Sequence, residues 1–217
     1  MSNPSRTSLS ISVRRHFIDR FFYAHSALIG AGSRIIDIGG KKEGKRGLFD
    51  ITKYGTNVTY VNIDEKNNPD ILADATNLPV NDESYDIAIM GELLEHVPDP
   101  RAVLKEAFRV LKNNGVALIT VPFMYPIHGD PDDYGRYTES FWEKVATDLG
   151  FKVSSIKRQG GMFAVTALMV QHLFRAKKKS WTPIQNALVK FFMWLDNRSV
   201  HPLFRAWTTG YGIILRK

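Results

Sequence analysis

The segment VPFMYPIHGDPDDYGRYT concentrates side chains that could move a proton or hold an anion. Its seven residues HGDPDDY contain one histidine and three aspartates, a high density for a simple connection. Histidine titrates near neutral pH, so it suits the role of general base toward a hydroxyl group, and a neighbouring carboxylate can orient its ring. We therefore predict His128 as the base, Asp130 or Asp133 as the orienting carboxylate, and Arg136 as the group that holds an anionic or sugar part of the substrate. The same residues also suit a structural turn, in which aspartates cap the chain and Arg136 pairs with Asp133.

The stretch RIIDIGGKKEGKRG has the pattern of a short strand followed by a glycine-rich turn, and two nucleotide-binding motifs compete for it. Gly39, Gly44 and Lys45 match the phosphate-loop pattern G-x-x-x-x-G-K-[ST], except that Arg46 stands where a hydroxyl should ligand Mg²⁺. A glycine follows Arg46, which disfavours the helix that a phosphate loop requires at this point. In the other motif, Asp37 and Gly39 open a D-x-G turn of the kind that holds S-adenosylmethionine. The missing hydroxyl favours this second interpretation.

The methyl-donor interpretation also accounts for neighbouring residues. Gly39 and Gly40 would let the backbone approach the methionine part of the donor. Asp37 would order the turn or reach the ammonium group of the donor through water. Asp64 ends the run YVNID, where it could accept hydrogen bonds from both ribose hydroxyls. A nicotinamide cofactor would use a carboxylate at the same place, so the turn alone leaves the cofactor open.

The hydrophobic pattern predicts a parallel α/β sheet that positions these residues. Short apolar runs predict strands: RIIDI, NVTYVNID, DILAD, YDIAIM, GVALITVP, FKVSSI and GYGIILRK. Residues 103–111 repeat apolar side chains at helical spacing, and KNNG at 112–115 predicts the end of that helix. Another helix is expected after Thr138, and residues 14–29 predict an amphipathic helix that precedes the first strand. Strands that alternate with helices are typical of folds whose ligands bind at the carboxyl ends of the strands.

The stretch ADATNLPVNDESYDIAIMGELLEHVPDPRAVLKEAFRVLKNNGVALITVPF decides between the cofactors. It contains, in order, D-A-x-x-L-P, then Y-D, then E-H-V-x-D-P, then L-x-E-x-x-R-V-L-K-x-x-G. In this combination the sequence resembles the class I S-adenosylmethionine-dependent methyltransferases of the methyltransferase type 11-like branch, from about Ile35 to Ile156. The resemblance implies an α/β, Rossmann-like seven-stranded sheet with helices on both faces, GYGIILRK as a reversed last strand, and a helical insertion before that strand.

The resemblance also implies an enzyme that uses S-adenosyl-L-methionine, and it assigns donor-binding roles. With Gly40 added from the turn, the expected cofactor-binding residues are Asp37, Gly39, Gly40, Asp64, Asp74, Ala75, Gly91, Glu92 and Leu93. Many members of the family carry G-x-G-x-G in the first turn, whereas this sequence reads GGKKEGKRG. The departure concerns the contacts of Lys41 to Arg46 and leaves the expected fold unchanged.

The pattern H-x-D-P-x-D-x-x-R-Y-T resembles a subset of this branch that is associated with glycan and cell-surface polysaccharide modification. We therefore expect O-methylation of a sugar, glycan or related small acceptor. His96, in LLEHVPDP, is a second possible base, although it equally suits fixing the loop through Glu95 or Asp99. Two alternatives remain open: a catalytically degenerate donor-binding partner protein, and a P-loop-like NTPase.

Length and composition favour a single domain over residues 1–217, and the resemblance implies that it is a methyltransferase domain. We expect an N-terminal helix in 1–30, a donor-binding core in 31–157, a helical insertion or lid in 158–208 and the last strand in 209–217. There are no cysteines, and the six histidines show no pairing at metal-ligand spacing, so no metal is predicted. Charged residues interrupt the N-terminal segment, which therefore lacks the apolar core of a signal peptide and predicts a cytoplasmic protein.

The basic residues gather in the last 60 positions. Residues 158–217 contain ten Lys or Arg and one acidic residue, for a net charge of +9, together with Trp181, Trp194 and Trp207. Aromatic and basic residues on short amphipathic helices suit the surface of a membrane, so peripheral contact through 162–207 at the inner face of a membrane is one interpretation. A lid over the active site or a homodimer contact is the structural alternative. Nucleic acid is not expected, because the aromatic residues lie in apolar segments.

Overall fold

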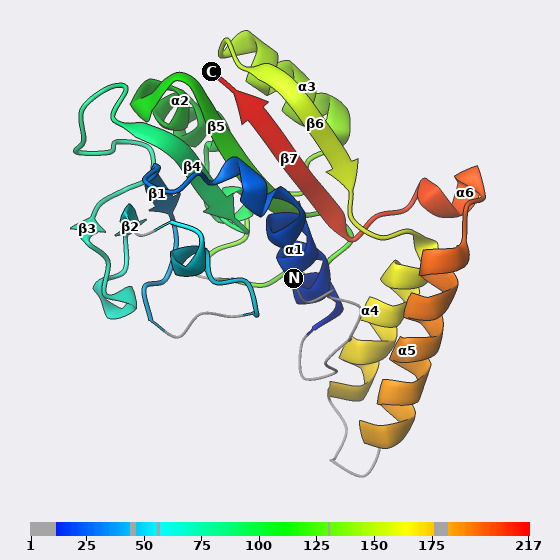
Figure 1. Ribbon diagram of the computed structural model, residues 1–217. Helices are drawn as coiled ribbons and strands as arrows, with labels where there is room; N and C mark the ends of the chain where they lie inside the picture. The colour runs from blue at the N-terminus through cyan, green and yellow to red at the C-terminus, as the bar shows by residue number, and fades with distance from the viewer. Residues whose placement is uncertain (1–11, 44–46, 56, 130, 176–181) are drawn as a thin grey trace.

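The predicted strands form one sheet in the computed structural model, which describes residues 12–43, 47–55, 57–129, 131–175 and 182–217. The described strands are β1 (Arg34–Ile38), β2 (Asn57–Asn62), β3 (Ile71–Leu72), β4 (Tyr85–Gly91), β5 (Leu111–Pro122), β6 (Lys152–Arg158) and β7 (Gly210–Arg216). These seven lie in the order β3-β2-β1-β4-β5-β7-β6 (Figure 1). Strands β1 to β5 pair in parallel, and β7 runs antiparallel to both β5 and β6. The expected fold, including the reversed last strand, is confirmed.

One face of the sheet is covered by α2 (Pro100–Val110) and α3 (Glu139–Asp148). The Asp99 side chain begins α2 by accepting a hydrogen bond from the backbone N–H of Arg101 at 2.9 Å, and Pro100 follows at the first helical position. The apolar stripe predicted in this region packs into a buried core with alternate residues of the strands. The helix ends at Val110, and β5 begins at the next residue, so the expected stop at 112–115 lies inside the strand instead.

The opposite face is covered by α1 (Val13–His25), the helix predicted before the first strand. Its side chains Ile18, Phe21 and Phe22 pack on the residues of β1, β4 and β5 that point away from α2. A short 3-10 turn, η1 (Ser26–Leu28), follows α1. The N-terminal helix is therefore part of the core of the domain.

The first crossovers differ from the alternation of strands and helices that the sequence predicts. In the described residues between β1 and β4, the only helical elements are the 3-10 turns η2 (Ile51–Lys53) and η3 (Glu65–Asn67). Another such turn, η4 (Leu94–His96), follows β4. These connections are rich in Gly, Asn and Asp, which favour turns over helices. The carboxyl edge of β1 and β2 is therefore built from loops.

The insertion before the last strand forms α4 (Met162–Arg175), α5 (Thr182–Arg198) and α6 (Pro202–Arg205). Helices α4 and α5 make a hairpin that projects from the sheet beside α1 (Figure 1). The buried carboxylate of Asp196 on α5 holds the start of α4 by accepting hydrogen bonds from the backbone N–H groups of Gly161 and Ala164, each at 3.0 Å. Within the described residues, we find no helix with the length and apolar character needed to cross a membrane. Trp181 lies outside the described residues.

Candidate functional site

A cavity of about 250 Å³ opens at the carboxyl ends of β1 and β4. The strand order reverses between these two strands, and such switch points are where open α/β sheets bind ligands. The described residues that line the cavity come from α1, the turn after β1, the η2 region, the end of β4 and the loop after β5: Ser12, Arg14, Arg15, Ile18, Asp19, Phe22, Asp37, Gly39, Gly40, Lys41, Phe49, Ile51, Ile89, Gly91, Glu92, His96, Tyr125 and His128. The fold thus brings the predicted glycine turn and the predicted base to one cavity. None of the described residues of α4 or α5 is among them.

The glycine turn after β1 leaves room that side chains would fill. Gly39 has a φ of +79°, and a Cβ there would lie 2.7 Å from the Leu93 side chain. A Cβ on Gly40 would lie 2.3 Å from the carboxyl group of Asp37. The side-chain amide of Asn62 donates hydrogen bonds to the carbonyl oxygens of Gly39 and Gly40, at 3.1 and 3.0 Å, and so fixes the turn.

The same turn does not lead into a helix, as a phosphate loop would. Among residues 39–43 and 47–55 the structure has only the 3-10 turn η2, which begins at Ile51. Residues 44–46, which carry the near-match to the lysine motif, lie outside the described residues. Lys42 is bound to Asp70 across the turn, with Nζ 2.5 Å from Oδ1.

The predicted ribose-binding carboxylate, Asp64, lies at the carboxyl end of β2, and Asp74 lies just beyond β3. Asp64 Oδ1 accepts a hydrogen bond from the backbone N–H of Lys66 at 3.0 Å. Asp74 Oδ1 accepts one from the backbone N–H of Thr76 at 2.8 Å. Both carboxylates are exposed. The described residues that line the cavity include neither of them, nor Ala75 or Leu93.

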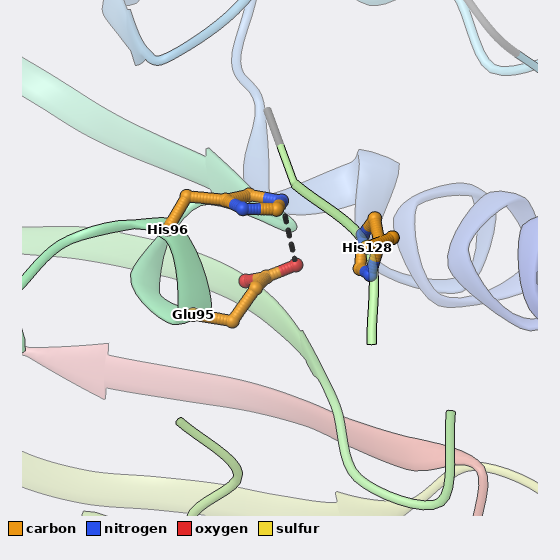
Figure 2. Close-up of side chains that lie close together, drawn as sticks. All are labelled: Glu95, His96 and His128. Atoms are coloured by element: carbon orange, nitrogen blue, oxygen red, sulfur yellow. Dashed lines mark ion pairs between the residues drawn. The ribbon is translucent and has the colours of Figure 1, made fainter. Parts of the chain in front are cut away.

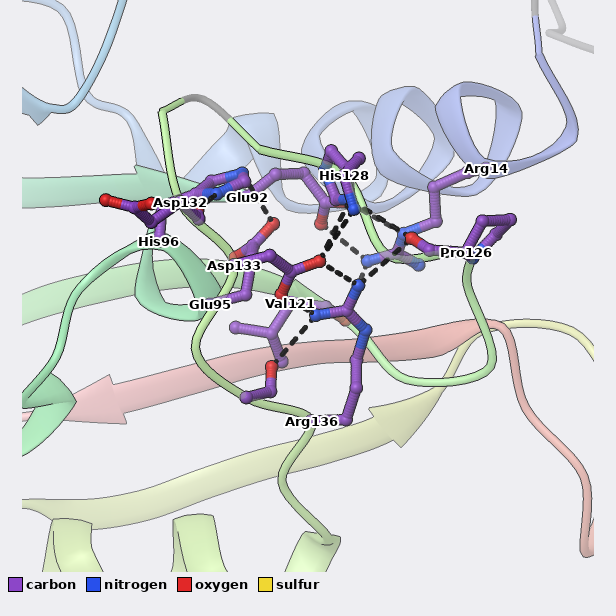
Figure 3. Close-up of polar contacts among 11 residues, drawn as sticks. Arg14, Glu92, Glu95, His96, Val121, Pro126, His128, Asp132, Asp133 and Arg136 are labelled. Atoms are coloured by element: carbon purple, nitrogen blue, oxygen red, sulfur yellow. Dashed lines mark hydrogen bonds and ion pairs between the residues drawn. The ribbon is translucent and has the colours of Figure 1, made fainter.

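The Glu92 side chain, predicted to line the donor pocket, is bound by a residue that the sequence patterns did not single out. Glu92 has a φ of +55°, and its carboxylate accepts hydrogen bonds from Arg14 Nε at 2.9 Å and from Arg14 Nη2 at 2.6 Å (Figure 3). Arg14 also donates to the carbonyl oxygen of Val121 at 2.7 Å and to the side-chain oxygen of Gln159. The guanidinium is 2% exposed, so α1 is attached to the site by a buried ion pair.

The segment after β5 folds around Asp133, as Figure 3 shows. Asp133 accepts hydrogen bonds from both terminal nitrogens of Arg136 and from the backbone N–H of His128 at 2.9 Å. Arg136 above all, with that backbone N–H, lowers the pKa of Asp133 to about 2. The structure therefore contains the Arg136–Asp133 ion pair that the structural interpretation of this segment predicted. Asp130 lies outside the described residues.

His128 faces the cavity with one ring nitrogen already engaged. Its Nδ1 lies 3.2 Å from the carbonyl oxygen of Pro126 and 3.4 Å from Asp133 Oδ2. Two oxygen acceptors beside Nδ1 place the proton there, which leaves the lone pair on Nε2. Burial, and next the charge of His96, lower the pKa of His128. The Tyr125 ring packs edge-on against His128, with ring centroids 5.0 Å apart.

His96 and Glu95, both on η4, lie beside His128 (Figure 2). The ring centroids of His96 and His128 are 4.9 Å apart, and His96 Nε2 is 3.6 Å from Glu95 Oε1. The Nδ1 of His96 lies 2.6 Å from the carbonyl oxygen of Asp132. Glu95 is 1% exposed, and burial, followed by the charge of Glu92, raises its pKa well above the usual range. From its sequence context, Glu95 was expected only to help His96 fix the loop. Its burial depends on how η4 packs against α2, β5 and the loop after β5.

A family model described as "Methyltransferase domain" matches residues 44–119. The chain carries a class I S-adenosylmethionine-dependent methyltransferase domain. Residues 44–119 include the patterns that carry the resemblance from the D-A-x-x-L-P stretch onward. The predicted enzyme class and methyl donor are thereby confirmed at the level of the domain.

Two curated relatives align with parts of this chain. The C-methyltransferase UbiE of ubiquinone/menaquinone biosynthesis in Neisseria gonorrhoeae is 29% identical over 124 residues, which cover 50% of this chain and 51% of the relative. The demethylmenaquinone methyltransferase of Lactobacillus johnsonii is 52% identical over 42 residues, 19% of this chain and 17% of the relative. The chain thus spans about half or less of the length of these relatives.

Solved structures agree with the fold. A SAM-dependent methyltransferase from Archaeoglobus fulgidus superposes with a TM-score of 0.61 at 19% identity, covering 94% of each chain. A putative sarcosine dimethylglycine methyltransferase from Galdieria sulphuraria gives 0.57 at 15% identity, covering 94% of this chain and 85% of that one. The shared feature is the methyltransferase sheet with its antiparallel last strand.

The residues at the switch point fit the methyl donor of this family. The cavity has side-chain-free walls at Gly39 and Gly40, where a Cβ would collide with Leu93 or Asp37. Carboxylates stand at the ends of β1 and β2, which is the arrangement that amino and ribose groups need. Gly39, Gly40 and Asp37 would hold the methionine part, and Asp64 would hold the ribose. The donor would supply a methyl group on an activated sulfonium.

Proposed function

We propose that this methyltransferase methylates a hydroxyl oxygen of a small acceptor, in the first place a sugar or a related polyol, with His128 as the group that accepts the proton. The observation that carries the proposal is the position of His128 Nδ1 beside Pro126 O and Asp133, from which we infer a proton on Nδ1 and a lone pair on Nε2. The lowered pKa of His128 keeps the ring neutral at pH 7, as a base must be. His128 and Gly40 line the same cavity, so the proposed base and the expected donor site open to one space.

In the proposed reaction, the protein aligns two reactants and moves one proton. The acceptor oxygen forms a bond to the methyl carbon, the bond from that carbon to sulfur breaks, and its electrons remain on sulfur, which becomes a neutral thioether. His128 Nε2 takes the hydroxyl proton as the new bond forms. The carboxylate of Asp133, held by Arg136, stabilises the imidazolium that results. Alignment of the two reactants supplies most of the acceleration, because the leaving group is already activated.

The polar wall of the cavity supports an acceptor rich in hydroxyl groups. Ser12, Arg15 and Tyr125 line the cavity together with His128. Hydroxyl, guanidinium and aromatic side chains together can hydrogen-bond and pack against a sugar ring. This combination, and the sequence pattern around His128, favour the sugar or polyol class.

A second candidate is C-methylation of a phenolic quinone precursor. It is favoured by the apolar wall of the cavity, where the rings of Phe22 and Phe49 stack at 5.2 Å beside Ile18 and Ile51. The two curated relatives are named for methylation of ubiquinone and menaquinone precursors, and their alignments cover about half or less of each chain. In this case His128 would take the proton of a phenol, and the ring carbon would bond to the methyl carbon as the methyl–sulfur bond breaks. The hydrogen on that ring carbon would then pass through water to the ring oxygen, which restores the phenol.

The proposal is tested by binding first and transfer second. Calorimetric titration with S-adenosylmethionine should show saturable binding, and Asp64→Asn should weaken it at least about 10-fold, because one ribose-binding charge is lost while Asn still caps η3. Transfer of labelled methyl is then measured to monosaccharides, sugar nucleotides, phenols and demethylated quinols. His128→Asn should lower turnover by about 100-fold or more with donor affinity retained.

Each outcome of this test decides between the candidates. Label in an O-methyl ether of a sugar or polyol supports the first candidate, and label on a ring carbon of a quinol supports the second. Donor binding without transfer to any class would favour a donor-binding partner protein. Wild-type turnover in His128→Asn would remove His128 as the base.

The exposed face of α5 is the basis for a proposal about membrane contact. Ile184, Phe191 and Trp194 are half exposed on this helix, and the guanidinium of Arg198 lies 4.6 Å from the centroid of the Trp194 ring. Apolar residues beside basic ones suit the interface of an anionic bilayer. In a sedimentation assay, the protein should therefore pellet with phosphatidylglycerol vesicles, whereas the double variant Phe191→Ser/Trp194→Ser should stay in the supernatant. A concentration-dependent dimer that the same double variant abolishes would assign this face to self-association instead.

A further inference from the structure

We propose that Glu95, His96 and His128 form a binding site for one divalent transition-metal cation on the acceptor side of the cavity. Each of the three offers one ligand atom, a ring nitrogen or a carboxylate oxygen, and these atoms lie within 4.8 Å of one another. Figure 2 shows the three side chains turned toward a common space, although η4 and the loop after β5 are separate in the sequence. The proposal concerns a ligand that the methyltransferase family model does not assign.

The donor set and its spacing suit a metal such as Zn²⁺, Fe²⁺, Mn²⁺ or Co²⁺. Two imidazoles and one carboxylate form a recurrent facial set for such cations, with coordination positions left open for substrate. With metal–ligand bonds of about 2.0–2.2 Å, neighbouring ligands stand about 3.0–3.4 Å apart. His96 Nε2 and Glu95 Oε1 are 3.6 Å apart, so this pair needs to close by only a few tenths of an ångström.

The tautomers of both histidines leave lone pairs for a cation. His96 Nδ1, 2.6 Å from the carbonyl oxygen of Asp132, must carry a proton, so Nε2 presents its lone pair toward Glu95. His128 Nδ1 is held in the same way by the carbonyl oxygen of Pro126 at 3.2 Å. A backbone carbonyl that fixes the second ring nitrogen is the usual outer support of a metal-binding histidine.

The carboxylate of Glu95 lacks the partner that its burial demands. The side chain is 1% exposed, and neither oxygen has a hydrogen-bond partner among the described residues. The nearby guanidinium groups are committed elsewhere, that of Arg14 to Glu92 and that of Arg136 to Asp133. A carboxylate oxygen and an imidazole lone pair therefore face each other at 3.6 Å in a buried place, which is unfavourable unless a proton or a metal cation lies between them.

The charges around the three residues can accept a cation. Glu92, Glu95 and Asp133 contribute three negative charges when ionised, and Arg14 and Arg136 contribute two positive ones. With Glu95 ionised, as a metal ligand must be, one excess negative charge faces the cation. His96 and His128 both line the cavity, so a bound cation would keep open positions toward the acceptor.

The role of the cation rests on the proposed methylation of a hydroxyl oxygen and replaces the proton transfer to His128, whereas binding of the cation depends on neither. A hydroxyl oxygen of the acceptor would occupy an open position, where the cation lowers the pKa of that hydroxyl and fixes the oxygen toward the donor methyl group. The hydroxyl proton would then leave to water, and His128 would serve as a ligand. The proton of the acceptor thus has two distinguishable routes, direct transfer to His128 or loss from a cation-bound oxygen.

The test is a titration of the chelator-treated chain with Co²⁺, in which binding is monitored by visible absorption. Competition by Zn²⁺ is measured by calorimetry. We expect one equivalent of Co²⁺ with ligand-field bands, displaced by Zn²⁺. Glu95→Gln, His96→Asn and His128→Asn should each weaken binding by about 100-fold or more, since even outer partners of metal sites are worth about 10- to 100-fold. The matched controls Glu143→Gln and His201→Asn should bind as the wild type does, because Glu143 is exposed on α3 and Asn at 201 keeps the helix cap of α6.

Folding is controlled within the same series. Glu95→Gln removes a buried charge without changing side-chain volume, so the metal-free variant should unfold at a urea concentration equal to or above that of the metal-free wild type. Absence of one-equivalent Co²⁺ binding by the wild type, or binding that Glu95→Gln leaves unchanged, overturns the proposal and indicates that a proton on Glu95 fills the gap.

Methyl transfer is scored separately. If the wild type binds no Co²⁺ and still transfers methyl groups in the presence of chelator, the cation site is overturned and His128 remains the base. If the wild type binds Co²⁺ but transfers no methyl group to any hydroxyl acceptor, the proposed function is overturned and the cation site remains.

Discussion

Replacement of Arg14 by methionine should destabilise the domain more than most single substitutions do. Methionine keeps the length of the side chain but removes every donor that Arg14 directs at Glu92, at the carbonyl oxygen of Val121 and at Gln159. The carboxylate of Glu92 would then stand without its partner in a nearly dry environment that also contains the buried Glu95. The substitution therefore isolates a charge where solvation is weak.

The magnitude follows from the burial of the pair. Breaking a buried ion pair by removing one partner costs about 3–5 kcal/mol, because the remaining charge is uncompensated. The lost hydrogen bonds to Val121 and Gln159 add about 1 kcal/mol each. The double variant Arg14→Met/Glu92→Gln carries no stranded charge, so it should lose only about 1–3 kcal/mol. Neutralising Glu92 in the Arg14→Met background should thus restore about 4 kcal/mol of stability, the difference between the losses of the single and double variants.

The assay is urea unfolding at pH 7, followed by circular dichroism. With a slope of about 2–3 kcal/mol per molar urea, a loss of about 5 kcal/mol lowers the midpoint by about 2 M. The control is Arg20→Met, an exposed position on the same helix, which should change stability by less than about 0.5 kcal/mol. A loss below about 1 kcal/mol for Arg14→Met, or a double variant as unstable as the single one, would refute the reasoning.

Three further predictions concern the site. Gly39→Ala and its control Gly32→Ala both place alanine at a positive φ, +79° and +90°, but only a Cβ at Gly39 would collide with a neighbour. Calorimetry should therefore show lost donor binding for Gly39→Ala alone. Equal effects of the two substitutions would contradict the close approach of the donor to Gly39. Because burial and His96 lower the pKa of His128, turnover of metal-free enzyme should fall only as the pH drops below 6.5, through that lowered pKa; a midpoint above 6.5 in the pH–rate profile would argue against His128. The pKa of Asp133 is lowered from 3.8 to about 2, so ionised Asp133 stabilises the fold above pH 3.8 by about 2 kcal/mol, and this contribution disappears as the pH falls from 3.8 to 2. Acid unfolding of Asp133→Asn should lack that component, and identical pH profiles for the two proteins would show that the pairing with Arg136 adds nothing.

Patterns between neighbouring residues predicted much of the fold. The apolar runs located the strands, with β3 shorter than its run, because each run must bury at least one face in the sheet. The helices α2 and α3 followed from apolar spacing and from capping residues such as Asp99. The turns between β1 and β4 were not predicted. The alternation of strands and helices was assumed to continue there, although the residues of these crossovers show no helical periodicity.

The sequence by itself determined the class of the domain, the methyl donor and the position of the glycine turn, because these depend on motifs that are contiguous along the chain. Only the tertiary structure decided which distant side chains share the cavity. Arg14 and Glu92 are 78 positions apart, and His128 follows Glu95 and His96 by about 30 positions. No periodicity links such residues. They meet because the carboxyl ends of parallel strands lie at one edge of the sheet, and because α1 packs on the sheet face with its first turn at that edge. The burial of Glu95 has the same origin, since desolvation depends on what packs around a group and not on its neighbours in the sequence.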